Sequence, residues 1–249
     1  MESAIKPEPS RTKKDETFLL VFLLDRTGSM ASCYEATISG FNEFLHEQQR
    51  EKEGEAFMTL VQFDVHGDDP ICQTRYSATK LSQVADLGSR RNLYRPRGNT
   101  PLFDAVGQTI LATDEVAGTY DHVLFTIQTD GYENASREFT QLQVFEMVGK
   151  RREAGWDFIF LGGDVDAYEL GSTLNVPMAN TLSYDSASQT GVAFASLSRT
   201  TTRLRQSRGA TGGAAEALPN APVARPPVPR TQPKDEAGHA DTADPKWLR

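Results

Sequence analysis

Continuous apolar runs alternate with helix-like patterns along most of the chain. The run Phe18–Leu24 is apolar at every position, which is typical of a strand buried on both faces of a parallel sheet. From residue 31 to about residue 51, apolar residues recur at spacings of three and four, which predicts a helix. Further strands are predicted at 57–63, 72–78, 123–127, 158–161 and 178–183, and further helices at 102–116, 139–152, 165–174 and 187–206.

This order of elements predicts the fold class. Strands that alternate with helices form crossovers between parallel neighbours, so we expect a doubly wound α/β fold. Its central sheet should be mainly parallel, with five or six strands and helices on both faces. On the helix at 139–152 we expect Leu142, Val144, Phe145 and Val148 to share one buried face. In such folds ligands bind outside the carboxyl ends of the strands, near a switch point in strand order.

The length and composition predict where the folded domain begins and ends. The 249 residues suit one domain with tails, and a hydrophobic content of 38% is low for a chain that is globular throughout. We expect a disordered leader at 1–15, the domain at 16–207 and a disordered Pro/Ala-rich tail at 208–249. The tail holds seven of the chain's 13 prolines, and the stretch 221–229 favours extended polyproline II conformations.

Charge and hydropathy narrow the classes of partner. The 26 basic and 34 acidic residues give a net charge of −8, which makes the chain a poor general binder of nucleic acid or anionic membrane. The longest apolar run, Phe18–Leu24, is far short of the ~20 residues of a membrane span, and the polar start resembles no signal peptide. We therefore expect a cytoplasmic protein in which Cys33 and Cys72 are reduced.

Three polar clusters lie at the predicted strand ends or beside them. They occupy 25–30 after the first strand, 98–102 before a helix, and 129–133 after the strand at 123–127. Their carboxylates and hydroxyls belong to Asp25, Thr27, Ser29, Thr100 and Asp130. Oxygen ligands without nitrogen or sulfur suit a hard cation such as Mg²⁺ or Mn²⁺. These five residues are the candidate metal ligands.

The three clusters, in this order, resemble the metal-ion-dependent adhesion site (MIDAS) of von Willebrand factor A (vWA) domains. The matching residues are Asp25-x-Thr27-x-Ser29, Thr100 and Asp130, and the segments Gly98–Ala105 and Thr129–Gly131 resemble the family's other two loops. The family's first loop is usually Asp-x-Ser-x-Ser, so Thr27 keeps the hydroxyl and adds a methyl group. The resemblance covers about residues 16–205 and extends to the intracellular bacterial or phage type of vWA domain.

The resemblance implies a function. In this family the hydroxyls usually contact the metal directly, and the two aspartates mostly act through water. A metal with few anionic ligands stays electrophilic, so a partner's Asp or Glu carboxylate completes its coordination shell. We therefore expect a metal-dependent protein-binding module that is not an enzyme and binds neither nucleic acid nor membrane.

Other interpretations of the same residues remain open. Ser29 and Thr100 would also suit helix caps, and Asp25 and Asp130 would suit ordinary turns. The metal site could be structural or vestigial in a scaffold component. A metal-dependent hydrolase is a third alternative, for which Glu133 and Asp164 are the nearby general-base candidates.

Four further residues, three inside the clusters and one beside them, have two interpretations each. Arg26, Tyr132 and Glu133 could form a specificity rim around the metal or could be solvated loop residues. Asp104 could support the metal ligands from behind, although its place in a first helical turn favours a simpler interaction with the helix dipole.

Overall fold

The computed structural model describes residues 15–208, in which one six-stranded sheet has the strand order β3-β2-β1-β4-β5-β6. The strands are β1 (Thr17–Asp25), β2 (Glu55–Phe63), β3 (Cys72–Lys80), β4 (His122–Thr129), β5 (Asp157–Gly163) and β6 (Thr181–Tyr184). All neighbours pair in parallel except β2 and β3, which are antiparallel. Residues 1–14 of the expected leader and residues 209–249 of the expected tail lie outside the described residues.

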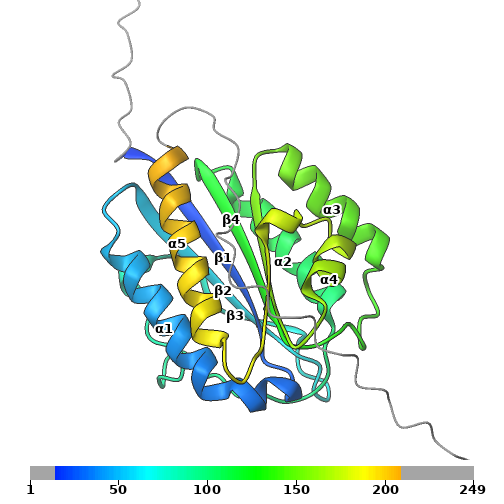
Figure 1. Ribbon diagram of the computed structural model, residues 1–249. Coiled ribbons are helices and arrows are strands. Elements are labelled where there is room, and N and C mark those ends of the chain that lie inside the picture. The colour runs from blue at the N-terminus through cyan, green and yellow to red at the C-terminus, as the bar shows by residue number, and fades with distance from the viewer. Residues whose placement is uncertain (1–14, 209–249) are drawn as a thin grey trace, which may run out of the picture.

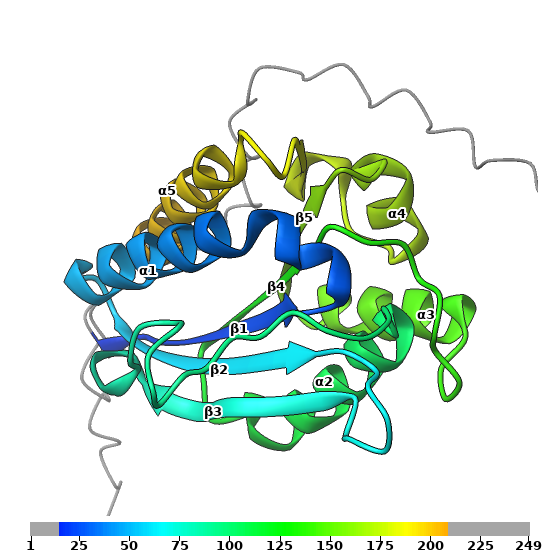
Figure 2. The same ribbon diagram turned by 90° about the horizontal axis from the view of Figure 1, so that it is seen from below.

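Helices cover both faces of the sheet, as the alternation of elements predicts. The helices are α1 (Tyr34–Arg50), α2 (Leu102–Ala117), α3 (Gln141–Glu153), α4 (Ala167–Thr173) and α5 (Thr190–Arg208). Short 3-10 helices are η2 (Gly28–Cys33), η3 (Leu81–Gln83) and η4 (Met178–Asn180). Helices α1 and α5 lie side by side on one face, and α2 and α3 lie on the other (Figures 1 and 2). None of the described helices is both long and apolar enough to cross a membrane.

The central strand β1 supplies both hydrophobic cores. Its even-numbered side chains, among them Phe22, pack with Phe41 and Phe194 from α1 and α5. The odd-numbered side chains, among them Val21, pack with Ile110 of α2 and the apolar residues of α3 and α4. Because neighbouring side chains of a strand face opposite sides, a strand covered by two helical layers is expected to be apolar where both layers cover it, and β1 is apolar throughout Phe18–Leu24.

The expected face of α3 is wrong for two residues. Val144 and Val148 are buried, but Leu142 is 66% exposed and Phe145 is 40% exposed. The helix begins at Gln141, after a capping box made by Thr140 and Gln143. At 100° per residue, positions 144 and 148 point nearly the same way, and position 142 points to the far side of the helix. Only a narrow stripe of α3 therefore faces the sheet.

Both edges of the sheet are irregular or short. The pairing of β2 with β3 shifts register twice, between Met58 and Leu60 and between Leu60 and Val61. At the end of β3, Lys80 forms an ion pair with Glu55. The opposite edge strand, β6, has four residues, because 178–180, which we expected to be strand, form η4 instead.

Candidate metal site

The site lies where the two central parallel strands end side by side. Strand β1 ends at Asp25 and β4 at Thr129, and the two strands pair from Phe18 to Leu24. The chain leaves β1 for β2 on one side of the sheet, whereas β4 leads to β5 on the other. The strand order thus reverses between β1 and β4, which is where doubly wound folds bind ligands.

Asp25 organises the first loop from a fully buried position. Its Oδ1 accepts a hydrogen bond from the Thr27 amide at 2.6 Å, and its Oδ2 accepts one from the Thr129 hydroxyl. The side chain has no exposed surface. Asp25 therefore fixes the turn that carries Thr27 and joins it to the end of β4, through a threonine that sequence analysis did not single out.

The three predicted hydroxyls form a continuous chain of contacts. The Thr100 hydroxyl donates to Thr27 Oγ1 at 3.3 Å, and Thr27 Oγ1 and Ser29 Oγ are 3.2 Å apart. The Ser29 hydroxyl then donates to Asp130 Oδ1. With Asp25 bonded to the Thr27 amide, all five predicted residues lie together, although three separate segments of the chain supply them.

Neither hydroxyl that we considered as a helix cap has that role. The residue at the N-cap of η2 is Thr27, that of α1 is Cys33 and that of α2 is Pro101, all without a side-chain capping bond. Ser29 lies inside η2, and Thr100 precedes the α2 cap. Helix capping therefore does not account for Ser29 or Thr100.

A glycine in a left-handed conformation places the Thr100 loop. Gly98 has φ +68°, and a Cβ there would lie 2.0 Å from the Val65 carbonyl oxygen. Its own carbonyl accepts from the Gly28 amide at 3.0 Å, which joins the Thr100 loop to the first loop. The Thr100 amide donates to Asn134 Oδ1 at 2.8 Å. Backbone contacts thus fix Thr100 from both sides.

Gly131 leaves the hydroxyl cluster uncrowded. A Cβ at this position would lie 3.0 Å from Thr100 Oγ1 and 3.6 Å from Ser29 Oγ. A larger residue at this position would therefore place its side chain in contact with the two hydroxyls. The missing side chain leaves room beside oxygens that an ion could contact.

Both carboxylates are costly to ionise in this environment. Burial is the main reason that the pKa of Asp25 is raised to about 7; the nearby Asp130 also raises it, and the hydrogen bonds from Thr129 and Thr27 lower it. Burial likewise raises the pKa of Asp130 to about 6, opposed by the bond from Ser29. No Lys or Arg of residues 15–208 hydrogen-bonds either carboxylate. A divalent cation would supply the missing positive charge, so the residues present fit such an ion.

The candidate ligands differ from those of metal sites built mainly from carboxylates, imidazoles and thiolates. The described residues contain no group of three or more His, Cys, Asp or Glu side chains that could hold a metal ion. The candidate site has two carboxylates, Asp25 and Asp130, and takes its other oxygens from hydroxyls. Any ion there would keep water ligands, as Mg²⁺ commonly does.

Comparison with known proteins gives structural matches alone. No family model matches the chain, and no curated protein sequence matches it. The vWF domain of the type V pilus tip protein Mfa5 from Porphyromonas gingivalis matches with a TM-score of 0.58 at 11% identity, covering 80% of this chain and 98% of that domain. The chain has a vWA fold.

Two longer proteins share this vWA fold. The pilus adhesin SpaC from Lactobacillus rhamnosus GG matches with a TM-score of 0.56 at 14% identity, over 76% of this chain and 31% of SpaC. Proximal thread matrix protein 1 (PTMP1) from the mussel byssus matches with a TM-score of 0.54 at 11% identity, over 77% of this chain and 48% of PTMP1. The chain thus spans less than half of either protein.

Arg26 is neither part of a rim around the candidate metal site nor a solvated loop residue, which corrects both alternatives. Its side chain is buried, and its Nε and Nη2 donate to Asp64 Oδ1 at 3.0 and 2.6 Å. Nη1 donates to Gln73 Oε1 at 2.8 Å. The other oxygen of Asp64 accepts from Arg97 Nε at 2.7 Å. Arg26 therefore ties the first loop to β2 and β3, through an aspartate whose position just after β2 was its only signal in the sequence.

Glu133 and Asp164 are both engaged in structural hydrogen bonds. Glu133 accepts from the backbone amides of Phe103, Ala135 and Ser136 and from the Ser136 hydroxyl. Asp164 accepts from the amide and hydroxyl of Ser186. A general base needs a free lone pair aimed at the reacting water. Glu133 has no lone pair left for this role, whereas each oxygen of the exposed Asp164 keeps one. The hydrolase alternative therefore loses Glu133 and keeps Asp164 as its candidate.

Asp104 and Tyr132 shape the loop between β4 and α3. The fully buried Asp104 carboxylate accepts from the amides of residues 137, 138 and 139. Asp104 therefore holds this loop through direct hydrogen bonds. Its place in the first turn of α2 still allows the expected interaction with the helix dipole, but that interaction does not account for these bonds. Tyr132 is 54% exposed, and its hydroxyl accepts from the Asp166 amide at 2.9 Å. It lies beside Gly131, so it fits the rim that we considered.

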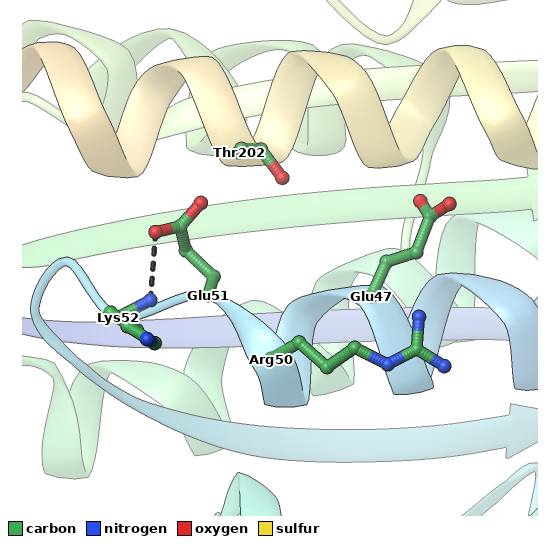
Figure 3. Close-up of a pocket in the computed structure, with 5 residues that line it drawn as sticks. All are labelled: Glu47, Arg50, Glu51, Lys52 and Thr202. Atoms are coloured by element: carbon green, nitrogen blue, oxygen red, sulfur yellow. Dashed lines mark hydrogen bonds between the residues drawn. The ribbon is translucent and has the colours of Figure 1, made fainter.

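A separate hollow lies at the far end of α1. It has a volume of about 400 Å³ and is lined by Glu47, Arg50, Glu51, Lys52 and Thr202 (Figure 3). Its two acidic and two basic side chains balance, and Glu51 already accepts from the Lys52 amide. The candidate metal site precedes the start of α1 at Tyr34, so most of the 17-residue helix separates the two places.

Proposed function

We propose that residues 16–207 form a vWA domain that acts as a metal-dependent protein-binding module. Mg²⁺ or Mn²⁺ would be held by Thr27, Ser29 and Thr100, with Asp25 and Asp130 in direct or water-mediated support. The proposal rests on the chain of three hydroxyl oxygens, 3.2 and 3.3 Å apart, that ends on the buried Asp130 carboxylate. The buried Asp25 carboxylate holds the amide of the middle member, Thr27.

The ligand set favours capture of a carboxylate. Hydroxyl oxygens are neutral, so a bound divalent ion keeps most of its charge and can attract an additional anionic oxygen. An Asp or Glu side chain of a partner protein supplies such an oxygen. The chain's own residues would orient the ion and hold the loops still, and the acceptor positions of Glu133 are all occupied by structural hydrogen bonds. The proposed activity is therefore binding and not catalysis.

Calorimetric titration with Mg²⁺ tests the metal site. Thr27→Val removes the hydroxyl but keeps the shape of the side chain, whereas Thr27→Ser keeps the hydroxyl. We expect Thr27→Val to weaken Mg²⁺ binding about tenfold or more, and Thr27→Ser to change it far less. Thr119→Val is the matched control, because Thr119 is exposed beyond the end of α2. Equal affinity in all four proteins would exclude Thr27 as a ligand.

Partner binding is tested with the full-length chain on a resin. Proteins retained with Mg²⁺ should be released by EDTA and should not bind the Ser29→Ala variant. If the same proteins are retained in EDTA and by the Ser29→Ala variant, the scaffold alternative is favoured, in which the metal site takes no part in binding. Metal-dependent hydrolysis of a generic phosphoester by the wild-type protein would favour the enzyme alternative.

A further inference from the structure

One segment beside the candidate metal site is strongly basic in an otherwise acidic chain. The sequence Ser89-Arg-Arg-Asn-Leu-Tyr-Arg-Pro-Arg97 contains four arginines, although the chain as a whole has a net charge of −8. It belongs to the connection from β3 to α2, which leads directly to Thr100. Figure 2 shows this connection running past β1 and β2 toward their carboxyl ends.

Three contacts place this segment against the end of β2 and the loop after β1, which carries Thr27 and Ser29. The Leu93 carbonyl accepts from Gln62 Nε2 at 3.0 Å, one residue before the end of β2. The Tyr94 hydroxyl donates to the Asp25 carbonyl at 2.7 Å. The Arg97 amide donates to the Arg26 carbonyl at 2.8 Å. Residues 93–97 therefore flank the loop that carries Thr27 and Ser29.

Three of the arginines are exposed and lack a counter-charge. Arg90, Arg91 and Arg95 are all exposed, and none of them forms an ion pair with another described residue. Burial of Tyr94 between them anchors the segment, so these side chains extend from a fixed backbone. Exposed cations on a rigid loop are suited to binding an anionic partner.

The nearby carboxylates cannot neutralise these arginines, because other groups already hold them. Asp64 is bonded to both Arg26 and Arg97, and Asp69 is paired with Arg97 at 2.5 Å. Asp86, which precedes the segment by three positions, is paired with His46 at 2.7 Å. The positive charge of the exposed arginines therefore faces solvent.

Two neighbours extend the surface and add apolar area. Arg75 on β3 donates weakly from Nη2 to the Arg91 carbonyl at 3.4 Å, and its buried Nε has no hydrogen-bond partner among the described residues. Leu93 is 39% exposed in the middle of the segment. We call Arg75, Arg90, Arg91, Leu93 and Arg95 the arginine surface.

We propose that the arginine surface binds an acidic peptide segment of the same partner whose carboxylate reaches the metal. This inference rests on the proposed function and names the chemistry of its partner. Guanidinium groups pair with carboxylates in a two-pronged geometry, and Leu93 offers an apolar contact between them. The chain's overall negative charge opposes long polyanions such as nucleic acid. A short cluster of Asp and Glu residues meets the local positive charge without that penalty.

Fluorescence anisotropy with two labelled peptides tests the inference on the full-length chain. One peptide has about twelve residues of alternating Glu and Gly, and the other keeps only its central Glu, with Gln at the remaining Glu positions. The test variant is Arg90→Gln/Arg91→Gln/Arg95→Gln. The control is Arg50→Gln/Lys150→Gln/Arg199→Gln, which changes net charge equally at exposed positions on α1, α3 and α5.

The inference expects a selective loss. With Mg²⁺ present, the test variant should bind the acidic peptide about tenfold more weakly, and the control within about twofold of wild type. Binding of the single-carboxylate peptide and of Mg²⁺ itself should change in neither variant. High salt should weaken binding of the acidic peptide more than binding of the single-carboxylate peptide.

Four results would overturn the inference, and they separate it from the proposed function. If the acidic peptide binds in a magnesium-dependent way with equal affinity to wild type and to the three-arginine variant, the arginine surface is refuted and the proposed metal-dependent module is not. Binding of both peptides without Mg²⁺ would remove the proposed function itself. Equal loss in the control variant would assign the effect to net charge. An oligothymidylate that binds as tightly as the acidic peptide, with the same arginine dependence, would identify a nucleic-acid surface.

Discussion

The hydroxyl of Tyr94 donates to the backbone carbonyl of Asp25 across a sequence separation of 69 residues. Tyr94 is 1% exposed and stacks on Tyr34, the first residue of α1, with ring centroids 5.8 Å apart. The contact fastens the connection between β3 and α2 to the end of the central strand. A single buried phenol therefore links the arginine surface to the loop that carries the candidate metal ligands.

Replacing this phenol should weaken the fold measurably. Tyr94→Phe leaves the ring in place but removes the donor, so we expect the free energy of unfolding to fall by about 1–2 kcal/mol. Urea denaturation measures the change. Tyr34→Phe is the matched control, because no hydrogen bond of its hydroxyl occurs among the described residues, and it should change stability by less than about 0.5 kcal/mol. Equal effects would show that the Tyr94 hydroxyl carries no special role.

Gly98→Ala should disrupt the Thr100 loop. The added Cβ would lie 2.0 Å from the Val65 carbonyl oxygen in a backbone with φ +68°, so the loop must move. We expect a loss of several kcal/mol, about 3 or more, because strain and a steric clash combine. Gly67→Ala has a similar φ of +59° but open space around it, so it reports the conformational cost alone, about 1 kcal/mol. Thermal denaturation of both variants separates the two contributions.

Asp104→Ala should destabilise the loop between β4 and α3. Removing this carboxylate leaves three backbone amides, those of residues 137–139, without their acceptor. We expect a loss of about 3 kcal/mol in unfolding free energy. Asp114→Ala, on the same helix, breaks an exposed ion pair with Arg151 and should cost under about 1 kcal/mol. Similar losses in both variants would contradict the role assigned to Asp104.

Both cysteines should react slowly with thiol reagents in the folded protein. Cys33 and Cys72 form no disulfide in the described part of the chain. Burial raises the pKa of Cys33 to about 11 and that of Cys72 to about 12, from an ordinary value of 9.0. The thiolate is the reactive form, so at pH 8 the folded protein should react much more slowly than the protein in guanidinium. The native rate should keep rising with pH beyond 9, where that of the unfolded chain levels off. A native rate equal to the unfolded one would contradict this burial.

The layers of the fold could be predicted because they depend on local patterns. The uniform apolar run of β1 reports burial on both faces, and the spacings in α1 report one buried side. The outer surface of α3 could not be predicted this way. Leu142 and Phe145 are apolar, and only the start of the helix at Gln141 and its orientation on the sheet turn them outward.

The candidate ligands could be predicted for a related reason. Asp25 and Asp130 lie at or just beyond strand ends, and parallel strands bring such positions together whatever the intervening sequence. The supporting groups lack this advantage. Tyr94, Asp64 and Thr129 act through contacts across 69, 38 and 104 residues. Asp64 and Thr129 lie at or just after strand ends, but no local pattern identifies the partner of any of the three. Arg26 shows the same limit, because its motif suggests an exposed rim and its ion pair with Asp64 buries it.

The two irregular sheet edges also restrict how this protein can assemble. A long, flat edge strand offers unpaired amides and carbonyls to another chain, which leads to strand addition and aggregation. Here β3 is bent by two register shifts and ends in a paired Lys80, and β6 offers only four residues. Neither edge is a good template for a foreign strand. Strand addition at either edge is therefore disfavoured, both for a partner protein and for a second copy of this chain.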